Sequence, residues 1–169
     1  MKRNYIYDCV YELIDRYNTS DPFELMKYLG IYCESSNLEH LKGYCVIIHG
    51  IKFIAINENL SRIERKIVAA HELGHIILHS DKLKAAAHED MNIYHVTDKT
   101  EYQANMFAAE LLIDDDEVDD LAKTEGIDFC SMAKTLYTNP QLLTFKLFGM
   151  AKRGYNYHFP IPPQSDFLA

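Results

Sequence analysis

The sequence lacks a long apolar run. No uninterrupted stretch of its 169 residues approaches the ~20 apolar residues of a transmembrane helix. The segment that follows Met1 is interrupted by Asp8, Glu12 and Asp15, so it does not form the apolar stretch of a signal peptide either. The sequence therefore predicts a cytoplasmic protein without a membrane partner.

Basic residues are also in short supply. The chain has 17 lysines and arginines against 25 aspartates and glutamates, which gives a formal net charge of −8. Nonspecific binding of nucleic acids depends on a surplus of positive charge that neutralises phosphates. The composition therefore argues against direct binding of DNA or RNA, and a neutral or basic protein partner fits it better.

Paired cysteine motifs are missing. The four cysteines, Cys9, Cys33, Cys45 and Cys130, show no C-x-x-C spacing and lie in apolar surroundings. This pattern is typical of reduced, structural cysteines and not of a zinc knuckle or a disulfide framework.

Internal repeats and linker-like segments are absent as well, so the length predicts one domain over residues 1–169. Within it we expect C-terminal helices over 114–152 and an extended, proline-containing tail over 155–169.

Hydrophobic periodicity predicts an α+β fold in that domain. Apolar residues recur every three or four positions over 5–17, and a second helix is expected from Asp21-Pro22 to Leu29. Three strands are expected over 31–34, 43–48 and 51–57, with a hairpin turn at His49-Gly50. We interpret these as a small, mostly antiparallel three-stranded sheet.

A capping box marks the start of the next helix. Ser61 is the cap and Glu64 stands three residues on, so a helix is expected to run to about His79 and to pack on the sheet. Residues 80–96 show no periodicity that favours a helix or a strand. Further helices are expected over 98–113, 115–123, 129–137 and 140–152.

Alanines and acidic residues add detail to the later helices. Ala104, Ala108 and Ala109 are small enough to let the helix over 98–113 approach a neighbour closely. Six acidic residues within 114–120 are typical of a solvated helix start that the macrodipole favours.

His71-Glu72-Leu73-Gly74-His75 is an H-E-x-x-H motif in the middle of the capped helix, which is the context this motif requires. Residues four apart project from one face of a helix, so His71 and His75 can bind one metal ion. Glu72 lies about 100° further round, beside that ion. A zinc ion lowers the pKa of a water molecule, and Glu72 can act as the general base that takes its proton during attack on a peptide carbonyl.

A catalytic zinc site needs a third protein ligand. The candidates are His79, His88 and Glu101, and the spacing favours Glu101 because it begins the next helix. Asn105 follows one turn later on the same face and can hydrogen-bond a ligand imidazole. The alternative interpretation of Glu101 is a plain capping residue at a helix start.

The segment GYCVIIHGIKFIAINENLSRIERKIVAAHELGHIILH, followed by EYQANMFAAELLI, resembles the ImmA/IrrE family of zinc metallopeptidases, over about residues 20–113. The resemblance implies a zincin-like core, one zinc ion on His71, His75 and Glu101, and Glu72 as general base. The usual substrates in that family, which is often encoded by phages and mobile elements, are helix-turn-helix repressors. By analogy with zincins, strand 51–57 is expected to be the edge strand with which the substrate pairs.

Two alternatives remain open at this point. A metal-binding interaction module that binds a repressor without cleaving it would carry the same ligands. A peptide deformylase would also use H-E-x-x-H, with Cys45 as its third ligand, but the remaining deformylase motifs are missing. The residue that stabilises the oxyanion is not identified by the sequence, and His88, Tyr94, His95, Tyr102 and Tyr155 are of suitable types.

Overall fold

The computed structural model describes residues 5–88 and 98–157. Within these ranges, helices and strands follow one another as α1 (Tyr5–Tyr17), α2 (Pro22–Tyr28), β1 (Tyr32–Ser36), β2 (Gly43–Ile48), β3 (Ile51–Asn57), α3 (Arg62–Leu78), α4 (Ser80–His88), α5 (Asp98–Leu112), α6 (Asp115–Ala122), α7 (Phe129–Thr135) and α8 (Pro140–Lys152). These elements confirm the α+β class. None of the helices in the described ranges is long and apolar enough to span a membrane.

The sheet has the strand order β1-β3-β2 and is mixed. The β2–β3 hairpin is antiparallel, as expected, and turns at His49 and Gly50, both of which have positive φ angles. β1 pairs with β3 in parallel, so the expectation of a mostly antiparallel sheet is wrong for this second pairing. The reason is that β1 pairs with the far side of β3 and not with β2, its neighbour in the sequence.

β3 is the central strand and not an edge strand. Its residues Ile54, Ala55 and Ile56 are fully buried. Both hydrogen-bonding edges of β3 are already used, by β1 and by β2, so a substrate peptide has no free edge there. The expectation that strand 51–57 receives the substrate is therefore wrong, because hairpin order alone does not determine which strand becomes central.

Most helix starts follow the predicted capping signals. Asp21 caps α2, with Pro22 at the first helical position. Ser61 and Glu64 form both hydrogen bonds of the capping box at the start of α3. α4 was not expected: only His79 separates it from α3, and Leu83 is its one buried residue among those whose side chains the structure describes. With so little apolar surface, its sequence carries almost no periodic signal.

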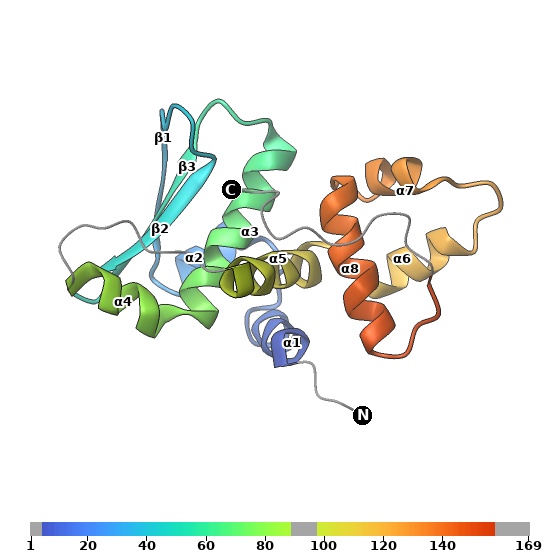
Figure 1. Ribbon diagram of the computed structural model, residues 1–169, viewed down its shortest axis with the longest axis horizontal. Helices are drawn as coiled ribbons and strands as arrows, with labels where there is room; N and C mark the ends of the chain where they lie inside the picture. The colour runs from blue at the N-terminus through green and yellow to red at the C-terminus, as the bar shows by residue number, and fades with distance from the viewer. Residues whose placement is uncertain (1–4, 89–97, 158–169) are drawn as a thin grey trace.

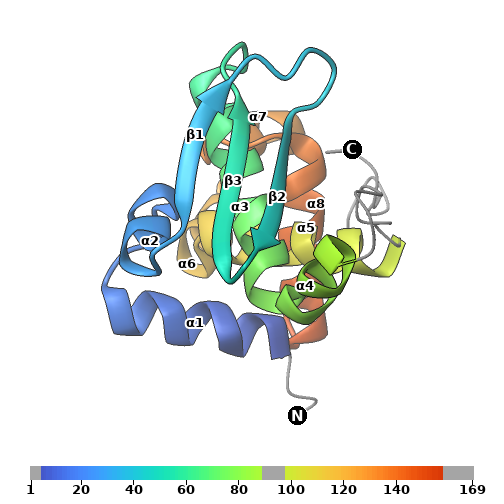
Figure 2. The same ribbon diagram turned by 90° about the vertical axis from the view of Figure 1, so that its left-hand side faces the viewer.

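The helices form layers behind the sheet (Figures 1 and 2). α3 packs against β2 and β3, α5 packs against the other side of α3, and α8 packs against α5. Figure 2 shows the sheet facing the viewer, with α6, α7 and α8 on the far side of α3. α3 is therefore the central helix, which explains why its residues from Ile67 to Ile76 are all buried.

Two glycines set the close approach of α3 to its neighbours. A Cβ atom at Gly43 of β2 would lie 2.6 Å from Cγ1 of Val68, and one at Gly74 of α3 would lie 3.1 Å from Cβ of Phe107. The first distance leaves no room for a side chain unless Val68 moves, and the second is tighter than ordinary van der Waals contact. β2 and α5 therefore pack directly against the backbone and short side chains of α3, on both sides of the H-E-x-x-H motif.

The acidic run begins α6 as expected, with one exception. Asp114 caps the helix and accepts hydrogen bonds from the backbone N–H groups of Asp116 and Glu117. Asp115, however, is partly buried and forms ion pairs with Lys146 and Arg153 of the C-terminal region. At the start of the expected tail, the rings of Tyr155 and Tyr157 stack with centroids 5.8 Å apart, and the residues after 157 lie outside the described ranges.

Candidate active site

Helix α3 presents the H-E-x-x-H residues to the interior of the molecule. His71, Glu72 and His75 are all buried, with exposed fractions of 4%, 8% and 3%. The two imidazoles lie on one helical face, and their Nε2 atoms are 3.1 Å apart. Two histidine nitrogens thus meet at one buried point, which is the arrangement that the four-residue spacing predicts.

Glu101 joins these two histidines from the first turn of α5. Its Oε2 lies 3.2 Å from Nε2 of His71, and its Oε1 lies 2.9 Å from Nε2 of His75. One ligand atom from each of the three residues lies within 4.8 Å of the others. The Glu101 side chain therefore faces the histidines and does not only cap its own helix.

The chemistry of this cluster fits a metal ion. Burial raises the pKa of Glu101, but hydrogen bonds from His71 and His75 outweigh that effect and hold it at about 2, so the carboxylate is ionised. Burial opposes the charged form of His71, whereas Glu101 and Glu72 raise the pKa of this imidazole. Two imidazole nitrogens and one carboxylate oxygen are the donors found in catalytic zinc sites with an open fourth position.

Each imidazole has a partner at its other ring nitrogen. Nδ1 of His71 donates to Oδ1 of Asn105 over 2.8 Å, and Asn105 is fully buried. This is the position and the contact expected for Asn105. Nδ1 of His75 lies 3.2 Å from Nδ1 of His79, whose own Nε2 lies 3.1 Å from Oε1 of Gln103.

His79 and His88 are the alternative third ligands. The described contacts of His79 are with the Nδ1 side of His75, away from the Nε2 atoms that face Glu101. Burial lowers the pKa of His79 despite its bond to Gln103, which favours the neutral form of the ring. The side chain of His88 lies outside the described residues. Gln103 is not predicted from the sequence, where its one signal is its position two residues after Glu101.

Glu72 lies beside the cluster with Cys45 of β2 as its neighbour. Burial raises the pKa of the Cys45 thiol well above its ordinary value, and the Glu72 carboxylate, which accepts a hydrogen bond from that thiol, raises it further. Cys45 is not among the metal-ligand atoms that converge in the described part of the chain. Its thiol contacts Glu72 instead, which is not the ligand position that a deformylase requires.

The candidate oxyanion residues divide into two groups. Tyr94, His95 and the side chain of His88 lie outside the described residues. Tyr102 packs against the rings of Phe145 and Phe148 on α8, and burial raises its pKa to about 12. Tyr155 stacks on Tyr157. The described contacts of these two tyrosines are therefore with the C-terminal region and not with the histidine cluster.

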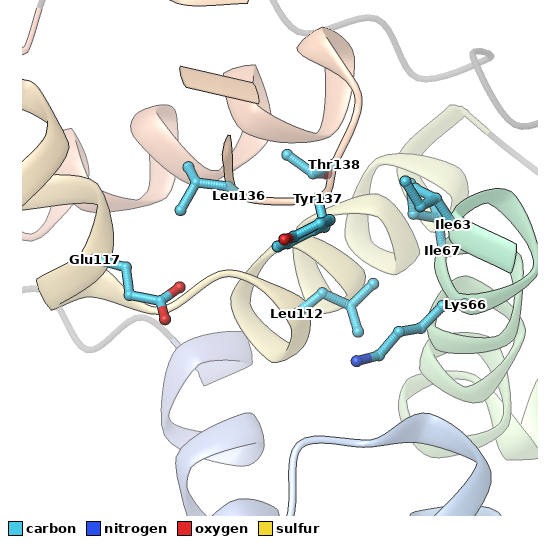
Figure 3. A pocket seen from close by; sticks show the side chains of 8 residues that line it. All are labelled: Ile63, Lys66, Ile67, Leu112, Glu117, Leu136, Tyr137 and Thr138. Carbon is cyan, nitrogen blue, oxygen red and sulfur yellow. The ribbon is translucent and has the colours of Figure 1, made fainter. Parts of the chain in front are cut away.

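A separate cleft of about 190 Å³ lies where α3 meets the C-terminal helices. In Figure 3 the Tyr137 ring stands between Glu117 on one side and Ile63 and Ile67 on the other. The lining residues are Ile63, Lys66, Ile67, Leu112, Glu117, Leu136, Tyr137 and Thr138. None of the residues of the histidine cluster lines this cleft, so it is a different surface of the molecule.

Comparison with known proteins relates this chain to a family of peptidases. The family model for the IrrE N-terminal-like domain, Peptidase M78, matches residues 26–130. An "Uncharacterized immunity region protein 2" of Bacillus phage phi105 is 39% identical over 117 residues, which cover 69% of this chain and 73% of that protein. "Metallopeptidase ImmA" of Bacillus subtilis (strain 168) is 32% identical over 111 residues, which cover 63% of this chain and 62% of that protein.

Proposed function

The chain belongs to the Peptidase M78 family of the IrrE N-terminal-like domain, and from this premise we propose that it is a zinc-dependent endopeptidase that cleaves a helix-turn-helix repressor. Membership of the family and the name of the ImmA relative support a metallopeptidase. The observation that carries the proposal is the convergence of His71, His75 and Glu101 beside Glu72 in a buried position. All four residues lie within the matched range 26–130.

His71, His75 and Glu101 would hold the ion. Two imidazoles and one carboxylate suit zinc best among the common divalent metals, and the number of donors leaves a coordination position open for water or substrate. A bound zinc ion supplies a Lewis acid that polarises the peptide carbonyl and makes water more acidic. Asn105 holds the His71 ring through the Nδ1–H bond, which leaves Nε2 of His71 available for the ion.

Glu72 is the proposed general base. The helix places it one residue after His71, so its carboxylate lies beside the ligands without being one of them. In this position it takes a proton from the attacking water and delivers it to the leaving amine.

A repressor substrate is supported by two observations outside the site. The phage relative is named for an immunity region, and the resemblance to the ImmA/IrrE family implies helix-turn-helix repressors as substrates. The chain's net charge of −8 is compatible with a DNA-binding protein as the partner and unfavourable for DNA itself. Such a substrate agrees with the cytoplasmic location expected from the sequence.

The proposal is tested with Glu72→Gln. Wild type and the variant are expressed in bacterial cells, and new protein N-termini are identified by mass spectrometry. We expect new N-termini within helix-turn-helix proteins for wild type only, because the loss of a general base slows such reactions by about 10²–10⁴-fold. Both purified proteins should contain about one zinc ion per chain, whereas Glu101→Ala should lose it.

The controls separate the alternatives. If wild type binds zinc but produces no new N-termini, the interaction module without catalysis is the better description. If Glu72→Gln cleaves as fast as wild type, Glu72 is not the base. If wild type takes up no zinc even when it is offered, the metallopeptidase proposal is wrong as a whole.

A further inference from the structure

Three polar side chains, Gln103, His79 and His75, form a row of contacts that ends at His75, one of the proposed ligands. Oε1 of Gln103 lies 3.1 Å from Nε2 of His79, and Nδ1 of His79 lies 3.2 Å from Nδ1 of His75. His79 is 6% exposed and the His75 ring is almost completely buried, so the contact between the two rings is shielded from water. This row of side chains runs from Gln103 of α5, through His79 at the end of α3, to His75 on the face of α3 that carries the site.

The position of each proton in this row of side chains follows from the amide of Gln103. An amide oxygen only accepts, so Nε2 of His79 must donate to Gln103. The Nδ1 atom of a neutral His79 is then an acceptor, and Nδ1 of His75 donates to it. With the ion bound, this would leave Nε2 of His75 its lone pair for the metal, and Nε2 is the atom that faces Glu101 and His71.

We propose that His79 and Gln103 are positioning residues that fix the tautomer and the ring rotation of His75 so that its Nε2 binds the metal ion. The inference rests on the proposed function, since it concerns the same metal site. His79 would support the ring of His75 as Asn105 supports the ring of His71. The side chain that contacts the ligand is an imidazole in the first case and an amide in the second.

The end of α3 makes this geometry possible. His79 is the C-cap residue of α3, with φ −128° and ψ 21°, and its N–H still bonds to the carbonyl of His75. Because residues four apart share one face of a helix, the ring of His79 lies next to that of His75, with ring centroids 5.3 Å apart. The same spacing that the sequence analysis considered for a third ligand therefore provides a support for the second ligand.

The test is the zinc affinity of the purified protein, measured by competition with a chromophoric chelator. Removal of a partner behind a ligand weakens metal binding by about 10–100-fold, and we expect this for His79→Ala. His79→Asn should remain within a few-fold of wild type, because its Oδ1 can accept the bond from His75. His40→Ala, which changes an exposed histidine far from the site in the sequence, should bind zinc as wild type does.

A second readout reports the tautomer directly. In zinc-loaded, ¹⁵N-labelled protein, the Nδ1 nitrogen of His75, which carries the proton, should show a ¹⁵N–¹⁵N coupling to Nδ1 of His79 across the hydrogen bond. The coupling should disappear in His79→Ala. If His79→Ala does not fold, Gln103→Leu provides the same test, since it removes the acceptor and keeps both rings, and it should weaken zinc binding by less than about tenfold.

The outcomes separate this inference from the proposed function. Unchanged zinc affinity in both His79→Ala and Gln103→Leu, or a His75 that binds zinc through Nδ1, would overturn the positioning role and leave the metallopeptidase proposal standing. Loss of affinity in His79→Asn equal to that in His79→Ala would also overturn it, because the acceptor would then be irrelevant. Failure of wild type itself to bind zinc would instead overturn the proposed function.

Discussion

Helix α5 contributes one carboxylate to a charged cluster near each of its ends, Glu101 to one and Glu110 to the other, and the two clusters are neutralised differently. Near its C-terminal end, Glu110 pairs with Lys146 at 2.8 Å and with Arg153, and Asp115 pairs with the same two basic residues. Near its N-terminal end, the ion pairs of Glu101 within the described ranges are with His71 and His75, and no lysine or arginine takes part. The carboxylates around Glu110 are therefore neutralised by a lysine and an arginine, whereas the described partners of Glu101 are two imidazoles.

This difference separates a structural cluster from a functional one. Glu110, Asp115, Lys146 and Arg153 balance as two acids and two bases, so no ligand is needed to compensate their charge. Glu101 carries a negative charge beside two histidines that are neutral when they bind a metal. A cation at that place would compensate this charge, which adds an electrostatic reason for the proposed ion to the geometric one.

The largest effect is expected from a variant that breaks the charge balance of the structural cluster. Lys146→Met leaves Glu110 and Asp115 with Arg153 alone, and removal of one partner from a buried ion pair typically destabilises a protein by about 3–5 kcal/mol. We expect a decrease of that size in the free energy of unfolding, measured by urea denaturation. Zinc affinity should remain that of wild type, since Lys146 does not contact the histidine cluster.

Two further variants sharpen that result. Lys146→Met combined with Glu110→Gln restores equal numbers of acids and bases, so part of the lost stability should return. Lys134→Met removes an exposed lysine of α7 and should change the free energy of unfolding by less than about 0.5 kcal/mol. If the double variant is no more stable than Lys146→Met alone, charge balance is not what holds this cluster.

The second prediction concerns metal removal. A ligand present at a hundredfold excess over its Kd stabilises the folded state by about 2.7 kcal/mol. A chelator should therefore lower the midpoint of thermal unfolding of wild type, and it should have little effect on Glu101→Ala. In Lys146→Met, whose proposed metal site is intact, the chelator should lower the midpoint by as much as in wild type. A chelator effect in Glu101→Ala equal to that in wild type would show that the metal binds elsewhere.

The two clusters also differ in how well the sequence predicts them. His71, Glu72, His75 and Glu101 were proposed from one local motif and one helix start, because residues one turn apart share a helical face. The pairing of Glu110 with Lys146 and Arg153 joins residues 36 and 43 positions apart, and nothing local indicates it. It depends on the packing of α8 against α5, where a Cβ atom at Gly149 would lie 2.3 Å from Oε1 of Glu110.

The same distinction holds for the fold. Capping residues and the turn at His49-Gly50 predicted α2, α3 and the hairpin, since these signals act within a few residues. The parallel pairing of β1 and the helix α4 were missed. The first depends on which strand becomes central in the sheet, and the second has Leu83 as its one buried residue among those whose side chains the structure describes. The contacts of the His79 ring depend on how α3 ends and on where α5 packs, which again is tertiary information.

The smallest expected effect is a pH dependence of the metal-free protein. In the folded state the pKa of Glu101 is lowered from its ordinary value of 4.5 to about 2, so its contribution to stability is present above pH 4.5 and is lost as the pH falls toward 2. Urea denaturation in the presence of a chelator should show a loss on the order of 1 kcal/mol between pH 5 and pH 3 that Glu101→Gln lacks.

Asp115 also responds to acid in this pH range. Burial raises its pKa, but its hydrogen bonds and ion pairs with Lys146 and Arg153 outweigh burial and lower it. Acid should therefore weaken both clusters, and only the difference between wild type and Glu101→Gln belongs to the histidine cluster. With zinc bound, the ion takes the place of the histidine protons as the partner of Glu101, and acid should release the metal before the carboxylate is protonated in the folded state. Equal acid sensitivity of the metal-free wild type and Glu101→Gln would mean that Glu101 gains nothing from the two histidines, and that its carboxylate depends on the bound ion alone.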